Sequence, residues 1–389
     1  MKSAKLSVFL FSAWYPIESD LLGNFVQNHA KAIGKLTQVI VIYPHEDVFK
    51  TQKQKLTITE QKIENVIEIL VKYRKIENKG ILRKLIRFIR VRKAYQKGIA
   101  FAVQKYGKPD ICHVNVLTWT CFLALWLTRK YKVPFIITEH WTRYLPENNS
   151  FKGFFRKKIT KYVVKRAAAV TTVSSHLKQA MLSHGLYNAN YQVVPNVVDT
   201  VLFQPFVVEK NKKSILHVST LQNRHKNFSG ILRVVNKLSQ KRNDFVLNVV
   251  YDSDNSVHLP FVEENNLHDF VVFHGQKTGE ELVKHFNEAD FFVLFSNYET
   301  QGLVLIESFA CGKPVIASNI GAVNAIVNQT NGILVQPRNE DELLNAMLYM
   351  LDHYKDYDSI AIRNYAIENF SEKVVGEMFL KIYKEILND

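Results

Sequence analysis

Two carboxylates with an eight-residue spacing, Glu299 and Glu307, are the residues of this chain best placed to do chemistry. Five apolar residues, 291–295, precede them and predict a strand that is buried on both faces. A polar loop that holds Glu299 follows, and the helical pattern of Leu303–Ala310 puts Glu307 inside a helix. Gly302 lies where this helix begins, and the backbone N–H groups of a helix N-terminus bind anions. The stretch therefore predicts an anion site off the carboxyl end of a strand.

The same stretch resembles the E-x7-E motif of the retaining GT-B glycosyltransferases of group 1, family 4. Its continuation, ESFACGKPVIAS, is close to the family's EAMACGKPVIAS. The resemblance implies a nucleoside diphosphate sugar, linked to UDP or GDP, as the donor substrate, with no cofactor and no metal. It implies that Glu307 accepts both ribose hydroxyls and that Glu299 acts on the donor sugar as a catalytic residue. The diphosphate would bind the backbone of Gly302, Leu303 and Val304. The alternative is a buried βα unit with a surface carboxylate.

Further donor-binding residues follow from the same resemblance. The segment HVSTLQNRHKN stands where the family has V-G-R-L-x-x-x-K-G, so Lys226 matches a lysine that binds the diphosphate. Thr220 occupies the family's arginine position, and Arg224 is a candidate to supply the missing charge. A solvated surface loop is the alternative for Arg224. Gly275 ends a V-x-F-x-G segment that the resemblance places near the nucleotide base.

The first half of the chain carries the candidate histidine. PFIITEH resembles the family's P-x-x-x-T-x-H strand, whose active-site histidine falls on His140. A histidine at the carboxyl end of a strand can bind a sugar hydroxyl or share a proton with it. DICHVN resembles D-x-x-H-x-H with Asn115 in the last position, and we interpret His113 as structural. In the loop at residues 16–24, Gly23 remains of a glycine pair that the family keeps near the donor phosphates and the acceptor.

The length and the order of elements predict two domains. A chain of 389 residues is too long for a single core. The resemblance implies the α/β GT-B architecture, with two Rossmann-like domains that face each other across a cleft. We expect an acceptor-binding domain at 1–205, a nucleotide-sugar domain at 206–371, and a helix at 372–389 that crosses back to the first domain. A buried strand is expected at residues 6–12, and further strands are expected at 38–43, 167–174, 214–219 and 245–251.

Positive charge is concentrated in the first half of the chain. Residues 1–200 hold 33 Lys and Arg against 12 Asp and Glu, whereas residues 201–389 hold 18 against 24. Eleven basic residues lie within 72–97 and seven within 152–166, and apolar residues alternate with them. Both runs fit core-facing helices with basic outer faces, and both fit helices on an anionic membrane. In the second interpretation, the side chains that enter the lipid include Phe151, Phe154 and Phe155.

The remaining composition bears on location and partners. Three scattered cysteines are typical of reduced thiols in a cytoplasmic protein, and no apolar run is long enough to cross a bilayer. We expect a cytoplasmic enzyme that is peripheral on the inner face of the membrane. Its acceptor would be a glycan or a polyprenyl- or other lipid-linked sugar in cell-surface polysaccharide or glycolipid synthesis, and no nucleic acid partner is expected.

Three other functions stay open at this point. Asp252 and Asp254 spell the D-x-D of metal-dependent GT-A glycosyltransferases, although we interpret them as part of a turn. A GT-B sugar phosphorylase or sugar-phosphate synthase would share the donor-site residues. A non-enzymatic nucleic-acid-binding protein would explain the basic half of the chain, but not the paired glutamates.

Overall fold

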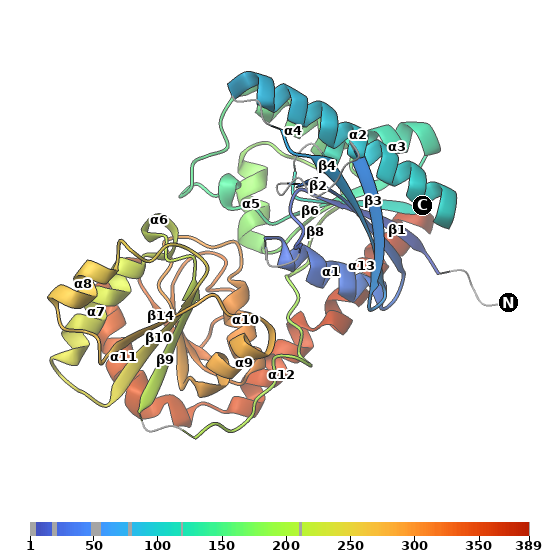
Figure 1. Ribbon diagram of the computed structural model, residues 1–389. Helices are drawn as coiled ribbons and strands as arrows, with labels where there is room; N and C mark the ends of the chain where they lie inside the picture. Colours follow the sequence, from blue (N-terminus) through green and yellow to red (C-terminus); the bar gives the residue numbers. More distant parts are fainter. Residues whose placement is uncertain are drawn as a thin grey trace.

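The computed structural model describes residues 5–17, 22–47, 56–76, 80–117, 120–209 and 212–388. It contains two β-sheets, each covered by α-helices (Figure 1). The first sheet has eight strands in the order β3-β4-β2-β1-β5-β6-β7-β8. Neighbouring strands are parallel except for β3 and β4. The strands are β1 (Ser7–Ser12), β2 (Gln38–Asp47), β3 (Leu56–Ile63), β4 (Val66–Arg74), β5 (Ile111–Asn115), β6 (Phe135–Glu139), β7 (Ala169–Thr172) and β8 (Tyr191–Val193).

Helices cover both faces of this sheet, so its strands are apolar on both sides. In β1, Val8 and Leu10 belong to the core under α1 and α13, whereas Phe9 and Phe11 belong to the core under α2, α3, α4 and α5. Successive strand residues point to opposite faces, which accounts for a strand whose six residues are all buried. The helices are α1 (Asn24–Gly34), α2 (Gly80–Tyr106), α3 (Thr120–Tyr131), α4 (Phe154–Arg166), α5 (Ser175–Ser183) and α13 (Glu372–Asn388), with the short 3-10 helix η1 (Thr142–Tyr144).

The second sheet has six parallel strands in the order β11-β10-β9-β12-β13-β14. The strands are β9 (Lys213–Ser219), β10 (Phe245–Tyr251), β11 (Val271–Gly275), β12 (Phe291–Leu294), β13 (Val315–Ser318) and β14 (Gly332–Val335). Phe291 and Val293 face a core under α7 and α11, and Phe292 and Leu294 face a core under α9, α10 and α12. The prediction of a strand buried on both faces is confirmed. The helices are α6 (Asn223–Lys226), α7 (Phe228–Ser239), α8 (Leu259–Glu264), α9 (Gly279–Glu288), α10 (Leu303–Ala310), α11 (Glu340–His353), η2 (Tyr354–Asp356) and α12 (Ser359–Phe370).

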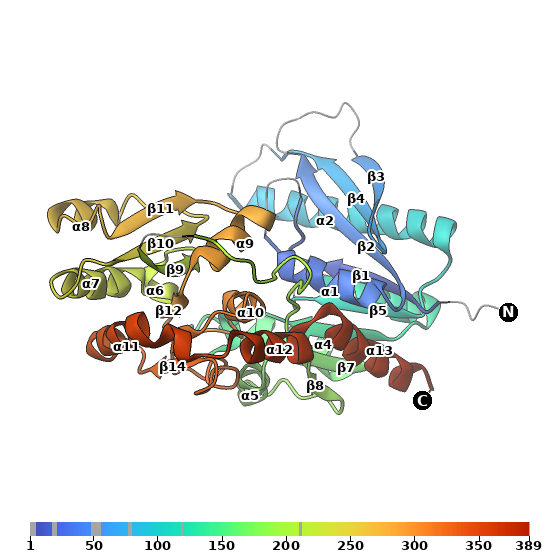
Figure 2. The same cartoon turned by 90° about the horizontal axis from the view of Figure 1, so that it is seen from below.

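The C-terminal helix α13 returns from the second sheet to the first (Figure 2). Val375, Phe379 and Ile382 on one stripe of this helix are buried in the core that also contains residues of β1 and α1. A helix that presents an apolar stripe must bury it against another element, and here that element is the face of the first sheet next to α1. The expected crossing of the last helix to the first domain is thus confirmed.

The chain passes between the two sheets at two places, and these two crossings are joined. The backbone nitrogen of Val198, in the connection from β8 to β9, donates a hydrogen bond of 2.9 Å to the carbonyl of Phe370, at the end of α12. The domain limits expected after residues 205 and 371 fall in these two connections. Both limits stay predictions.

Some local expectations differ from the structure. The strand expected at 38–43 continues to Asp47, because β4 runs parallel to it over that length. The strand expected at 167–174 is shorter, Ala169–Thr172. Within the loop expected at 16–24, residues 18–21 lie outside the described part of the chain. All three cysteines are buried and free, as their scattered positions suggested.

Candidate active site

The glutamate pair lies at the carboxyl edge of the second sheet. All six strands are parallel, so the loops after β9, β11 and β12 leave the same edge. The loop after β12 carries Glu299 and leads through Gly302 into α10, which carries Glu307. The loop after β9 carries α6 and Lys226. This edge is where ligands bind in open α/β sheets.

Glu299 and Lys226 form a close ion pair in this edge. Lys226 Nζ lies 2.5 Å from Glu299 Oε1, and the Ser296 hydroxyl donates to the same oxygen over 2.9 Å. The Glu299 side chain is only 6% exposed. Burial alone would raise the pKa of its carboxyl, but the Lys226 ammonium and His225 hold that pKa well below its usual range. Glu299 is therefore an ionised carboxylate beside a cation, although the sequence resemblance assigned these residues to different parts of the donor.

Two neighbours of this pair were not identified from the sequence. The His225 ring is stacked on the Tyr298 ring, with a centroid distance of 4.5 Å and an interplanar angle of 8°. This places His225 Nε2 3.5 Å from Glu299 Oε1. Ser296 is the other neighbour, through the bond described above. The His225 contacts depend on how the loops after β9 and β12 meet, and the Ser296 contact depends on the conformation within the second of these loops, so residue type and spacing do not signal them.

The N-terminus of α10 lies beside the carboxylates. Gly302 is its N-cap, with φ of 85°, a left-handed conformation that glycine adopts without strain. No side chain within the described residues caps this end, so the N–H groups of Leu303 and Val304 lack the partner that an N-cap side chain usually supplies. These N–H groups and the helix dipole favour an anion at this position. The structure thus places the predicted anion-binding turn next to Glu299.

Glu307 lies further along α10 and is in a different electrostatic state. Its side chain is 7% exposed, and no donor in the described part of the chain bonds to its carboxyl group. Burial raises the pKa of this carboxyl to about 8. A buried carboxyl that lacks a protein partner is a group whose hydrogen-bonding capacity is free for a ligand.

The other residues predicted for the donor site are more dispersed. Thr220 is half-buried directly after β9, and its carbonyl accepts a bond from the Ser253 hydroxyl. Gly275, with φ of 69°, ends β11 with open space where a Cβ would lie. Arg224 is exposed and donates a bond of 3.0 Å to the carbonyl of Asn148, which belongs to the first-sheet half of the chain. In this structure, Arg224 therefore bridges the two halves and does not contact the Lys226–Glu299 pair.

His140 lies at the carboxyl end of β6 in the first sheet. Its Nδ1 is 3.1 Å from Asn196 Oδ1, and its Nε2 is 3.1 Å from Asn115 Oδ1. Burial, followed by the nearby His29, lowers the pKa of His140 well below its usual value, so the imidazole is neutral. The Asn115 amide nitrogen is buried and has no partner among the described residues. A neutral imidazole donates from only one of its ring nitrogens, so the Asn115 amide satisfies the other when it turns its nitrogen toward Nε2.

Glu139, the residue before His140, holds the backbone of the segment that follows β6. The Glu139 carboxylate is fully buried and accepts bonds of 2.9 Å from the backbone nitrogens of Leu117, His140 and Trp141. With three backbone donors on its oxygens, Glu139 serves to orient the chain and is a poor candidate for a nucleophile. Its role was not predicted from the sequence.

Two further sequence interpretations can be compared with the structure. His113 is buried, and its ring nitrogens contact the Tyr383 hydroxyl at 2.7 Å and the Thr138 hydroxyl at 2.6 Å, as expected of a structural histidine. Gly23 is the N-cap of α1, where a Cβ would lie 2.5 Å from the backbone of Trp14. Glycine is therefore required at position 23 by packing, and its role toward the donor phosphates stays a prediction.

The D-x-D segment forms a local turn. The Asp254 carboxylate accepts bonds from the backbone nitrogen and the hydroxyl of Ser256, at 2.9 and 2.7 Å. Side-chain bonds of this kind, two residues along the chain, are typical of a turn. Asp252 is exposed and lies in the bend that precedes it. This geometry agrees with the interpretation of Asp252 and Asp254 as part of a turn.

The two basic runs form helices on one layer of the first sheet. Leu82, Leu85 and Ile89 of α2 are 43% to 55% exposed, and Phe154 and Phe155 of α4 are 73% and 78% exposed. Figure 1 shows α2 and α4 along the upper side of the first-sheet half of the molecule. Within the described ranges, no helix is both long and apolar enough to cross a membrane.

One of the expected membrane contacts is wrong. Phe151 is 3% exposed and packs against Tyr144, with ring centroids 4.8 Å apart, inside the core of the first sheet. Phe151 precedes α4, and the chain turns inward before the helix begins. Only Phe154 and Phe155 of this aromatic group are available to a lipid surface.

Comparisons with known proteins identify the class of this fold. The sucrose-phosphate synthase of Thermosynechococcus elongatus superposes with a TM-score of 0.75 at 20% identity, over 99% of this chain and 100% of that chain. The protein Alr3699/HepE of Anabaena, in complex with UDP and glucose, superposes with a TM-score of 0.70 at 16% identity, over 98% and 99%. The fold is GT-B, with two parallel-sheet α/β units, as the sequence resemblance implied.

Sequence comparison then identifies the family. The family model "Glycosyltransferase Family 4" matches residues 22–202, and "Glycosyl transferases group 1" matches residues 212–353. The alpha-monoglucosyldiacylglycerol synthase of Streptococcus pneumoniae is 26% identical over 298 residues, which are 71% of this chain and 67% of that protein. The chain belongs to the group 1, family 4 glycosyltransferases.

Proposed function

We propose that this protein transfers a sugar from a nucleoside diphosphate sugar, linked to UDP or GDP, to a hydroxyl group of a lipid-linked acceptor, with retention of anomeric configuration. The observation that carries the proposal is the Lys226–Glu299 pair at 2.5 Å, next to the uncapped N-terminus of α10. A cation and a helix N-terminus match a diphosphate, and a carboxylate matches sugar hydroxyls. The solved complex of the Anabaena neighbour with UDP and glucose supports this assignment.

Each residue of this edge has a task in the proposed reaction. Lys226 and the N–H groups of Leu303 and Val304 bind the diphosphate, and they stabilise the negative charge that it gains as the glycosidic bond breaks. Glu307 accepts the two ribose hydroxyls. Glu299 binds the donor sugar, where its negative charge stabilises the positive charge that develops at the anomeric carbon.

His140 acts from the other half of the molecule. Its neutral imidazole can accept a proton from a sugar hydroxyl or share a hydrogen bond with it. In the structure the side-chain amides of Asn115 and Asn196 each lie 3.1 Å from one ring nitrogen. A sugar hydroxyl would replace one of these amides when the substrate binds.

We further propose that the reaction needs no metal ion. Lys226 and the helix N-terminus supply positive charge that a divalent cation supplies in D-x-D enzymes. The Asp254 carboxylate is occupied by its own turn. Turnover should therefore be the same in EDTA as in added magnesium, and full loss of turnover in EDTA would contradict this part of the proposal.

The acceptor is proposed to be lipid-linked, in cell-surface polysaccharide or glycolipid synthesis. Exposed apolar side chains alternate with basic residues on α2 and α4, as on helices that bind an anionic membrane. The relative from Streptococcus pneumoniae is named as a synthase of a glycosylated diacylglycerol, which fits an acceptor at a membrane surface.

The test is a transfer assay with the α-linked nucleotide sugar that binds and a membrane lipid extract as the source of acceptor. We expect a glycolipid whose new linkage is α by proton NMR, and a strong loss of product in Glu299→Gln. A β-linked product would contradict retention. Wild-type turnover in Glu299→Gln would contradict the assignment of the site.

A further inference from the structure

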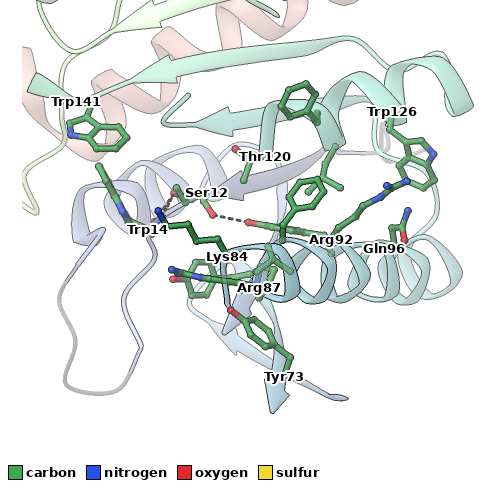
Figure 3. Close-up of a pocket in the computed structure, with 18 residues that line it drawn as sticks. Ser12, Trp14, Tyr73, Lys84, Arg87, Arg92, Gln96, Thr120, Trp126 and Trp141 are labelled. Atoms are coloured by element: carbon green, nitrogen blue, oxygen red, sulfur yellow. Dashed lines mark hydrogen bonds between the residues drawn. The ribbon is translucent and has the colours of Figure 1, made fainter. Parts of the chain in front are cut away.

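A large pocket lies in the first-sheet half of the molecule, away from the donor residues. Its volume is about 770 Å³, and it lies between α2 and α3, next to the carboxyl ends of β1, β2 and β4 (Figure 3). Pockets of this size hold ligands as large as a drug molecule or a short lipid. No residue assigned to the donor or to catalysis above lines it.

The lining of the pocket combines aromatic surface with positive charge. Trp14, Trp126 and Trp141 contribute to its walls, together with further phenylalanine and tyrosine side chains. The charged lining residues are Lys84, Arg87 and Arg92, and the lining includes no Asp or Glu. Within the described part of the chain, Lys84 and Arg92 form no ion pair, so their charge is available to a ligand. This combination matches a molecule that is apolar along most of its length and carries an anionic group.

The pocket extends from the neighbourhood of His140 to the outer surface. At its inner end, Trp141 directly follows His140 and packs edge-on against Trp14, with ring centroids 4.7 Å apart. At its outer side, Phe88 of α2 and Phe122 of α3 are 40% and 41% exposed. Figure 3 shows Trp14 and Trp141 together at one end and Trp126 at the other. A ligand in this pocket would reach from Trp141, the residue that follows His140, to the apolar face of α2.

The cations are distributed along the length of the pocket. Figure 3 shows Lys84 extending toward the Trp14 end and Arg92 extending toward Trp126. Both belong to α2, whose outer face carries the exposed leucines described above. An anionic group held near Lys84 would lie between an apolar chain on the α2 side and a sugar on the His140 side.

We propose that this pocket binds the acceptor and that the acceptor is a lipid phosphate, in which an apolar chain is joined through a phosphate to the sugar that receives the new residue. The proposal rests on the function proposed above and specifies its acceptor class. Trp126 and Phe88 contact the apolar chain, and Lys84 binds the phosphate. Arg92, at the Trp126 end, adds to the positive potential of the pocket, and Trp14 contacts the sugar at the inner end. The hydroxyl to be glycosylated then lies at the inner end, next to His140.

The experiment measures binding to the whole protein through its own tryptophans. Three of the four tryptophans of the chain line the pocket, so a ligand there should change the emission strongly. The probe is farnesyl phosphate below its critical micelle concentration, with farnesol and inorganic phosphate as the two partial ligands. Farnesyl phosphate should bind about tenfold more tightly than farnesol, because it adds charge-assisted bonds to apolar burial. Inorganic phosphate alone should leave the emission unchanged.

Variants separate the pocket from the surface of the same helix. The double variant Lys84→Gln, Arg92→Gln should bind farnesyl phosphate about tenfold more weakly than the wild type and should bind farnesol with unchanged affinity. Lys93→Gln with Lys97→Gln removes the same charge from exposed positions of α2 that do not line the pocket, and should change neither ligand. Gln96→Phe fills space beside Trp126 and should weaken both ligands. Circular dichroism and melting temperature check that each variant is folded.

The outcomes decide between sources of the lipid phosphate and test the proposal itself. Dihexanoyl phosphatidic acid offers the same phosphate on a diacylglycerol, so preferential binding of one probe assigns a prenyl or a diacyl chain. Equal binding of farnesol and farnesyl phosphate, or equal loss in the Lys93 and Lys97 control, would overturn the phosphate assignment. Unchanged binding of both ligands in Gln96→Phe would show that they do not bind in this pocket. Because no nucleotide is present, these results are independent of whether the donor proposed above is correct.

Discussion

The backbone nitrogen of Asn196 donates a hydrogen bond of 2.7 Å to Oε1 of Gln301. Gln301 lies two residues after Glu299, and the Asn196 side chain contacts His140 Nδ1 at 3.1 Å. One hydrogen bond therefore connects the donor-site loop of the second sheet to the residue that positions the candidate histidine of the first. A substrate that spans the two halves would meet groups whose relative position is already constrained. This constraint is a form of preorganisation.

The Lys226–Glu299 pair predicts a measurable coupling in stability. Both side chains are largely buried, at 13% and 6% exposure, so removing Lys226 leaves a carboxylate without its principal partner. We expect Lys226→Ala to lower the free energy of unfolding by about 3 kcal/mol. The additional change Glu299→Gln should restore most of it, because the unpaired charge is then gone. Urea unfolding of the two single variants and the double variant measures this, and additive effects would contradict the pair.

Glu307 predicts that donor affinity depends on pH. Its carboxyl has a pKa of about 8 in the ligand-free protein, and only the ionised form accepts two ribose hydroxyls. The ionised fraction rises about tenfold between pH 7 and pH 9, so the donor should bind about tenfold more tightly at pH 9. In Glu307→Gln, affinity at pH 9 should be lower by about 1.5–3 kcal/mol. Calorimetric titration across this range measures both effects.

The Glu307 carboxyl also predicts how protein stability depends on pH, and this dependence can be measured without the donor. Between pH 4.5 and about 8, Glu307 is protonated in the folded protein, because its pKa is raised there, but is ionised in the unfolded chain. Stability from this group is therefore present below pH 4.5 and is lost as pH rises to about 8. Glu307→Gln should remove this part of the pH dependence of unfolding. An identical slope in both proteins would show that Glu307 is not protonated in the folded state.

The surface of α2 and α4 predicts reversible binding to anionic vesicles. Each Lys or Arg near an anionic leaflet contributes about 1 kcal/mol, and Phe154 and Phe155 add an apolar contribution that salt does not screen. Co-sedimentation should require anionic lipid and weaken as salt rises. Changing Lys157, Lys158 and Lys161 of α4 to glutamate should abolish it.

The matched control for that experiment lies on the opposite face of the same sheet. Lys373, Lys381 and Lys384 are exposed on α13, and changing them to glutamate alters the net charge equally. This control should still bind. Equal loss in both triple variants would mean that total charge, and not the face formed by α2 and α4, determines binding. No binding to anionic vesicles at low salt would favour a soluble acceptor.

The sequence was informative where structure is local. The apolar run at 291–295 and the stripe of residues 372–387 each predicted an element and the faces it buries, because side-chain direction follows from strand and helix periodicity. The resemblance also placed Glu299, Gly302 and Lys226 at the same site, and the structure brings them to one edge of the second sheet.

The contacts that complete the site could not be predicted in this way. Gln301 and Asn196 are 105 residues apart, and their bond depends on how two halves of the chain pack. Phe151 shows the same limit, since the basic run that follows it is exposed but its own side chain is buried against Tyr144. The pocket between α2 and α3 arises from two helices and three strand ends, and no single stretch of the sequence indicates it.

The most direct test of the account is a thermal-shift screen of the wild-type protein with UDP-, GDP- and ADP-sugars. A ligand that binds only the folded protein raises its melting temperature, by about 2–5 °C at a concentration near 100 Kd. We predict that one nucleotide class gives this shift, that Lys226→Ala abolishes it because the diphosphate loses its cation, and that His140→Ala retains it. If no nucleotide sugar shifts the wild-type protein, or if Lys226→Ala retains the full shift, the proposed donor site is wrong.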